Sequence, residues 1–144
     1  SVVLTDNSVP GLKVHELVAI GRTPHTNFMG RLTKEDKRVV ESAMATMRIA
    51  HLANRDVASL SDGERQKCFI AKALAQETPI LLLDDVFDKL DMGRISNLLQ
   101  MVASNDFGQI FITDSNKVRM SGIVDRLTQD RAYYETQAGQ FTRL

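Results

Sequence analysis

The segment PILLLDD, residues 79–85, constrains the possible fold more strongly than any other part of the chain. Four consecutive apolar residues follow Pro79 and lead directly into the carboxylates of Asp84 and Asp85. An apolar run without alternation is typical of a strand that is buried on both faces, as in a parallel sheet covered by helices. The segment therefore predicts a central parallel strand and an α/β fold.

Two shorter apolar runs, residues 2–4 and 110–113, predict further buried parallel strands. Apolar residues at helical spacing lie between the strands and after them. They predict helices within residues 14–20, 34–52, 64–76 and 95–102, and one or two short helices within 115–130. Alternation of helices and strands is the pattern of an α/β fold.

Glycines and polar residues mark the expected connections. Gly21 is expected to cap the first helix at its C-terminus, and residues 22–31, which show no periodicity, are expected to form an exposed loop. Residues 132–144 predict a hairpin with its turn near Ala138 and Gly139.

The composition excludes several classes of function. The 144 residues carry 18 basic and 18 acidic side chains, interleaved along the chain, which disfavours DNA binding by bulk charge. Cys68 is the single cysteine, so an internal disulfide is excluded, and we expect it to be a buried hydrophobe. No apolar run is long enough for a membrane span and no signal-peptide pattern is present, so we expect a cytoplasmic protein without membrane insertion.

The segment LSDGERQ, residues 60–66, predicts a helix start that is able to bind an anion. Ser61 and Glu64 have the spacing of a capping box, and Gly63 leaves the backbone open to close approach. Free amide groups and the helix dipole favour phosphate at such a place. An ordinary capping box without a ligand is the alternative interpretation.

The carboxylates after the central strand predict a second chemical site. Asp84 is placed to hold Mg²⁺ through water, and Asp85 to orient a water molecule for attack on a phosphate. Asp91 is expected to start the next helix or to reach a neighbouring subunit. Adjacent carboxylates also occur on solvated surfaces, but the apolar run before them disfavours that alternative.

In this order and spacing, the motifs resemble those of the ABC-type ATPases. Residues 60–66 resemble the signature motif, residues 81–84 the Walker B strand, and residues 90–91 the D-loop. The resemblance implies a partial P-loop NTPase core with three parallel strands and an inserted α-helical subdomain. It also implies ATP and Mg²⁺ as cofactors of the family, with Asp84 at the metal. The residues that it places near the nucleotide are Ser61, Asp62, Gly63, Glu64, Asp91 and, where the family's Q-loop glutamine stands, Thr5.

The same resemblance implies three parts of the chain. Residues 1–8 correspond to the Q-loop strand and loop, and residues 9–77 to the helical subdomain with the signature motif. Residues 78–144 correspond to the C-terminal half of the ATPase core, with the Walker B strand, the D-loop, the switch strand and a terminal hairpin.

Different parts of the chain resemble two subgroups of the family. Residues 14–32 resemble the helical subdomain of iron-siderophore and metal-chelate importers, whereas residues 79–91 and 107–116 resemble the RecF DNA-repair ATPases. Asp85 stands at the position of the catalytic glutamate and Asp114 at that of the switch histidine, and the resemblance implies catalytic roles for both. We therefore expect a hybrid, natural or engineered, joined between Ala71 and Asp84.

The glycine-rich phosphate loop of the family, its Walker A motif, does not occur within these 144 residues. We therefore expect the chain alone to bind neither ATP nor Mg²⁺ and to show no ATPase activity. The expected function is that of a fragment of an iron-siderophore importer ATPase, completing an ATP site at a dimer interface. A RecF-like replication and repair ATPase fragment and a non-catalytic folding module remain as alternatives.

The expected partners follow from these alternatives. An uncovered sheet edge favours a homo-oligomer. An importer origin implies a membrane permease and a peripheral position at the inner membrane, and a RecF origin implies DNA.

Overall fold

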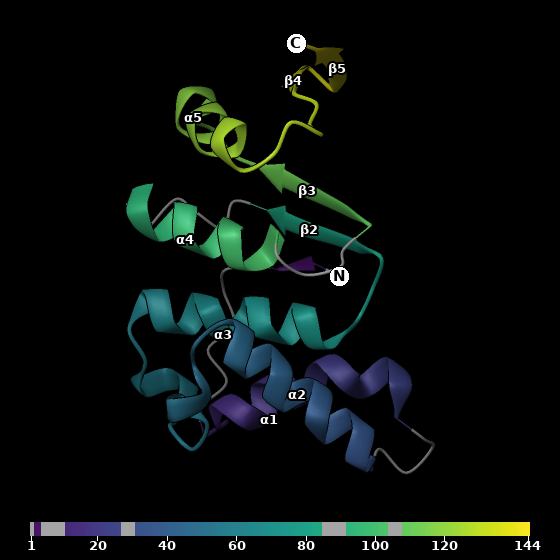
Figure 1. The fold of residues 1–144 in the computed structure, drawn as a ribbon, viewed down its shortest axis with the longest axis vertical. Coiled ribbons are helices and arrows are strands. Elements are labelled where there is room, and N and C mark those ends of the chain that lie inside the picture. The colour runs from purple at the N-terminus through teal and green to yellow at the C-terminus, as the bar shows by residue number, and fades with distance from the viewer. Residues whose placement is uncertain (1, 4–10, 27–30, 85–91, 104–107) are drawn as a thin grey trace.

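A small parallel sheet and a layer of helices below it organise the chain (Figure 1). The computed structural model describes residues 2–3, 11–26, 31–84, 92–103 and 108–144. The sheet contains β1 (Val2–Val3), β2 (Ile80–Asp84) and β3 (Gln109–Thr113) in the order β1-β2-β3, with both pairs parallel. The expected α/β fold and the central position of the strand at residues 80–84 are confirmed.

The two faces of the sheet differ in burial. Leu81 and Leu83 are fully buried, and their partners on β3, Ile110 and Ile112, pack against the same core. On the other face, Phe111 remains 47% exposed. The prediction that β2 and β3 are buried on both faces is therefore wrong for the described residues. Alternate residues of a strand point to opposite faces, and the described core contacts only one of them.

The helical layer precedes β2 in the chain. It contains α1 (Val14–Ala19), the 3₁₀ helix η1 (Ile20–His25), α2 (Lys34–Thr46), the short 3₁₀ turns η2 (Ala50–Leu52) and η3 (Val57–Ser59), and α3 (Asp62–Ala75). Helix α3 packs against α1 and α2 and lies between them and the sheet (Figure 1). Its buried side chains are Cys68, Phe69, Ile70, Ala71, Ala73, Leu74 and Ala75. This confirms the expectation of a helix that is packed over most of its surface.

The end of α1 departs from the sequence prediction. Gly21 is not a C-terminal cap, because α1 ends at Ala19 and the chain continues into η1. A Cβ atom at Gly21 would lie 2.2 Å from the carbonyl oxygen of Lys72, so glycine allows η1 to approach the backbone of α3. Arg22, expected in an exposed loop, is 5% exposed. Tertiary packing of η1 on α3 accounts for both differences.

The C-terminal part contains α4 (Met92–Ala103), α5 (Lys117–Leu127), β4 (Tyr134–Gln137) and β5 (Gln140–Arg143). Helices α4 and α5 pack together, and residues 115–130 hold one helix. The expected hairpin is confirmed, with Ala138 and Gly139 both at positive φ in the turn. It lies beside α5, at the end of the molecule opposite α1 and α2 (Figure 1). Among the helices described, none is long and apolar enough to cross a membrane.

Candidate functional site

The start of α3 forms the expected capping box. The Ser61 hydroxyl accepts a hydrogen bond from the Glu64 backbone N–H at 3.4 Å, and the Glu64 carboxylate accepts one from the Ser61 backbone N–H at 2.9 Å. The Ser61 hydroxyl also donates to the Glu64 carboxylate at 2.7 Å. These bonds from Ser61 hold the pKa of the Glu64 carboxyl below its usual value. The serine hydroxyl therefore already has an acceptor within the chain.

Charged side chains surround this helix start. Asp62 forms an ion pair with Arg65 one turn further along α3. Arg55 and His51 add weaker electrostatic stabilisation to the ionised Glu64. Arg55 also donates to the carbonyl oxygen of Ser59 at 3.0 Å, which joins the turn η3 to the residues that precede it. The start of α3 therefore carries both acidic and basic side chains.

A carboxylate and a hydroxyl meet at the carboxyl ends of β2 and β3. Asp84 and Thr113 are register partners, and the Thr113 hydroxyl donates to the Asp84 carboxylate at 2.5 Å. Asp84 is exposed at the carboxyl end of β2. Sequence analysis did not identify Thr113, because strand register had to be known before the two positions could be paired.

Asp84 fits the way in which proteins bind Mg²⁺. Among the described residues, no group of three or more His, Cys, Asp or Glu side chains could enclose a metal ion. Mg²⁺ is usually held by one or two carboxylates together with waters and substrate phosphates rather than by a complete protein cage. A single exposed carboxylate at the sheet edge suits that arrangement.

Asp114 follows β3 directly, and its carboxylate is engaged within the chain. The Asp114 side chain is 4% exposed. It accepts hydrogen bonds from the Asn116 backbone N–H and from Nη2 of Arg119, both at 2.6 Å. The Nε atom of Arg119 is buried without a hydrogen-bond partner. Sequence analysis missed Arg119, because nothing in its spacing from Asp114 marks it as an ion-pair partner.

The predicted residues fall into two groups in different layers. Asp84 and Asp114 lie near the carboxyl edge of the sheet, whereas Ser61, Asp62, Gly63 and Glu64 lie at the start of α3 in the helical layer. Helix α3 and strand β2 run in opposite directions across a short connection, so both groups lie on the same side of the molecule (Figure 1). Thr5, Asp85 and Asp91 lie outside the described residues.

Residues 2–88 match the family model described as ABC transporter. The chain belongs to this family. The matched region contains both the capped start of α3 and the strand β2 that ends at Asp84. The fold is therefore that of the ATPase domain of ABC proteins, an α/β P-loop NTPase.

Relatives of two kinds match the chain. It is 43% identical over 98 residues to the iron(3+)-hydroxamate import ATP-binding protein FhuC of Bacillus subtilis, which covers 68% of this chain and 36% of the relative. It is 42% identical over 89 residues to the DNA replication and repair protein RecF of Porphyromonas gingivalis, covering 56% and 24%. The chain therefore spans about a third or less of the length of these relatives.

Solved structures support the same fold. An inward-facing metal-chelate type ABC transporter matches with a TM-score of 0.77 at 23% identity, over 99% of this chain and 72% of that chain. A dimeric, post-hydrolysis state of the ATP-binding cassette MJ0796, bound to ADP and Pi, matches with a TM-score of 0.67 at 22% identity, over 82% and 53%.

Proposed function

We propose that these residues supply the signature helix start and the Walker B edge of a shared ATP site in an iron-siderophore importer. The observation that carries the proposal is the order of two features: a capped start of α3 at Ser61, followed by a parallel strand that ends at Asp84. Membership of the ABC family and the similarity to an iron(3+)-hydroxamate import protein support it.

The sheet edge would provide the chemistry of hydrolysis. Asp84 would hold Mg²⁺ through water, with the Thr113 hydroxyl fixing the orientation of its carboxylate. Asp85 would orient the attacking water. Asp114, held in position by Arg119, is proposed for the catalytic role of the switch histidine, whose position it occupies.

The helix start would complete the site from a second subunit. Amide groups of Asp62 and Gly63 at the positive end of α3 would bind phosphate oxygens. The Ser61 hydroxyl would donate a hydrogen bond to the phosphate. To do so, it must give up its hydrogen bond to the Glu64 carboxylate. Further nucleotide contacts are proposed for Asp91 and for Thr5.

We place the phosphate loop of this shared site outside the 144 residues, which contain no glycine-rich sequence of that pattern. Without it the terminal phosphates lose several backbone donors and a lysine. The chain alone is therefore expected to release no phosphate from Mg-ATP above the buffer rate in a steady-state assay. Turnover by the wild-type chain that is abolished in Asp85→Asn would contradict this.

The proposed division of the chain follows from these roles. Residues 1–8 form the Q-loop part, residues 9–77 the helical subdomain, and residues 78–144 the C-terminal half of the ATPase core. The helical subdomain would face a membrane permease, as in importers. A second copy is the proposed partner at the sheet edge.

A RecF-like DNA-repair function is the second candidate. Asp85 and Asp114 follow the RecF pattern rather than the transporter pattern, and RecF of Porphyromonas gingivalis is among the relatives. Retention of duplex DNA at low salt distinguishes the candidates, because the importer function predicts no retention. Specific retention that persists at 150 mM salt, roughly physiological ionic strength, would favour the RecF-like function.

A further inference from the structure

A buried ion pair joins η1 to α2. Arg22 is 5% exposed and Asp36 is 3% exposed, and Nε of Arg22 donates to the Asp36 carboxylate at 2.9 Å. The same carboxylate accepts hydrogen bonds from the Thr33 backbone N–H at 2.8 Å and the Thr33 hydroxyl at 2.6 Å. Asp36 is therefore held by the N-terminal cap of α2 and offers Arg22 a fixed anchor.

The same arginine reaches the end of α3. Its Nη1 atom donates to the carbonyl oxygen of Ala75 at 2.9 Å and to the Glu77 carboxylate at 2.6 Å. His25, at the end of η1, donates through Nε2 to the carbonyl oxygen of Gln76 at 2.9 Å. The last carbonyl groups of a helix have no partner within it, so side chains of η1 satisfy two of them here.

The residues that receive these bonds lead directly into the sheet. We define the junction as residues 76–79, between the end of α3 at Ala75 and the start of β2 at Ile80. Glu77 adopts a left-handed conformation with φ of 50°, and its N–H donates to the carbonyl oxygen of Leu74 at 3.0 Å. The carbonyl oxygen of Pro79 accepts a hydrogen bond from the N–H of Gln109 on β3 at 3.0 Å.

Glycine at the preceding position makes this arrangement possible. The absence of a side chain at Gly21 lets η1 lie against the Lys72 carbonyl oxygen on α3. Arg22 then reaches Asp36 on one side and Glu77 of the junction on the other. A planar guanidinium can make both contacts at once, which a lysine ammonium at this position could not do in the same geometry.

We propose that Arg22 is a positioning residue that fastens the helical layer to the junction and so sets the position of β2 and of Asp84 at its end. A displacement of η1 or α2, such as a partner bound to the helical layer would cause, is then passed through Arg22 to the carboxylate edge of the sheet. The role concerns the coupling of the two layers and does not depend on which nucleotide or partner the chain binds.

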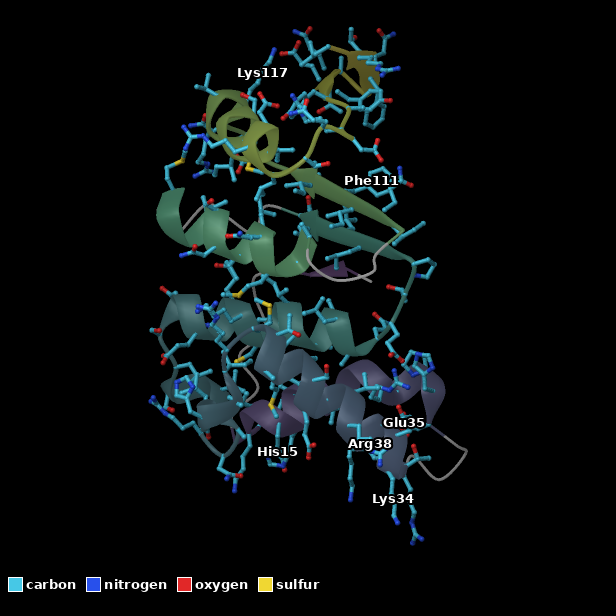
Figure 2. All side chains as sticks on the ribbon, in the orientation of Figure 1. His15, Lys34, Glu35, Arg38, Phe111 and Lys117 are labelled. Atoms are coloured by element: carbon cyan, nitrogen blue, oxygen red, sulfur yellow. The ribbon has the colours of Figure 1, made fainter. Side chains whose placement is uncertain are left out.

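The test compares local amide exchange and amide chemical shifts in Arg22→Gln with those in a control, Arg38→Gln. Arg38 lies at the surface of α2, 77% exposed and paired only loosely with Glu35 (Figure 2). In Arg22→Gln, exchange of the Glu77 and β2 amides should accelerate about tenfold more than exchange of the α5 amides, since charge-assisted hydrogen bonds are lost at the junction and at Asp36, whereas the bonds of Arg22 do not reach α5. The amide signals of Asp84 should also shift.

An equal acceleration in β2 and α5, with unchanged Asp84 signals, would overturn the proposal, because a purely stabilising role affects all globally exchanging amides alike. If Arg22→Gln does not fold, the same exchange measurement on Glu77→Gln tests the proposal. This variant keeps the pair of Arg22 and Asp36 and weakens only the contact to the junction. It should accelerate exchange in β2 about threefold more than in α2, since a neutral acceptor replaces a charged one. Unchanged β2 exchange would refute the coupling.

Discussion

The surroundings of Asp36 explain why its buried carboxyl group stays ionised. Its carboxylate accepts hydrogen bonds from Thr33 and from Arg22, and these hold its pKa at about 2. A buried carboxylate without such partners would be strongly destabilising, whereas this one replaces its lost hydration with hydrogen bonds. The spacing of Thr33 and Asp36 predicted the cap, but Arg22 was expected in a loop, so its part in the pair could not be predicted.

Acid should weaken the fold through Asp36. The pKa of its carboxyl is lower in the folded chain than the usual value near 4, so its contribution is present above pH 4 and is lost as the pH falls toward 2. The urea midpoint of the wild-type chain should fall through this window. Asp36→Asn should show a lower midpoint at pH 7 and a smaller decrease between pH 4 and pH 2. An equally steep decrease in the variant would show that other carboxylates carry the effect.

Cys68 should be inert in the folded chain. It is fully buried on α3, and burial raises the pKa of its thiol to about 12. Because the thiolate is the reactive species, a thiol reagent at pH 8 should modify Cys68 at least tenfold more slowly in the native chain than in urea. Equal rates under the two conditions would show that α3 does not exclude the reagent.

Gly21 and Gly122 offer a test of packing between elements. The Cβ atom of Gly21→Ala would clash with the backbone of Lys72, so we expect a loss of about 3 kcal/mol in the free energy of unfolding. Gly122 is exposed on α5, and an added Cβ would meet nothing within 4 Å. Gly122→Ala should therefore stabilise the chain by about 0.5–1 kcal/mol through helix propensity.

Urea unfolding of both glycine variants measures these changes directly. A Gly21→Ala chain as stable as the wild type would mean that η1 does not lie against α3 as described. Since Gly122→Ala makes the same chemical change in an open place, it controls for the general effect of replacing glycine with alanine.

Among the helices, strands and turns, the sequence predicted the features that local residue patterns mark. The capping boxes at Thr33 and Ser61, the strand at Ile80–Asp84 and the hairpin turn at Gly139 are all confirmed. The capping boxes and the hairpin turn are set by interactions within a few residues, and the strand is marked by its own apolar run. The exposure of Phe111 was not predicted, because an apolar run alone does not show whether a helix covers both faces of a strand.

In the candidate site too, contacts between near neighbours in the sequence were predictable and contacts between residues further apart were not. The bonds between Ser61 and Glu64 were predictable from their spacing of three residues. The bonds of Asp84 to Thr113 and of Asp114 to Arg119 were not, since the first crosses two strands and the second depends on how α5 starts. The roles proposed for these residues in catalysis remain predictions.

Across the whole molecule, the importer-like and RecF-like parts share one core. Strand β1 pairs with β2, and β2 pairs with β3, in a continuous parallel register. Buried residues of both parts belong to a single hydrophobic cluster, from Val14 near the start to Ile123 on α5. The proposed join between Ala71 and Asp84 is therefore compatible with a continuous core.

The sheet should also make the chain associate. Strand β3 is one of the two edge strands of the described sheet, and Phe111 lies on it with a half-exposed side chain (Figure 2). Exposed apolar edge strands favour pairing with another chain, and a lysine in such a strand opposes it. Light scattering should show a mass that rises with concentration, and Phe111→Lys should shift the rise to about tenfold higher concentration, a change of about 1.4 kcal/mol. A monomer at every concentration would exclude this interface.

The central claim is that these residues supply two parts of a nucleotide site, the helix start at Ser61 and the carboxylate at Asp84. The phosphate loop of that site lies outside the 144 residues. Equilibrium titration with Mg-ATP tests it most directly. One titration uses the chain alone. The other uses the chain mixed with an importer ATPase subunit that carries an intact phosphate loop and a signature motif whose serine has been replaced. We predict no saturable binding by the chain alone, and binding by the mixture that is tighter than by the added subunit and is weakened by Ser61→Ala. Micromolar binding of Mg-ATP by the chain alone, or a mixture that binds no better than its added subunit, would contradict the account.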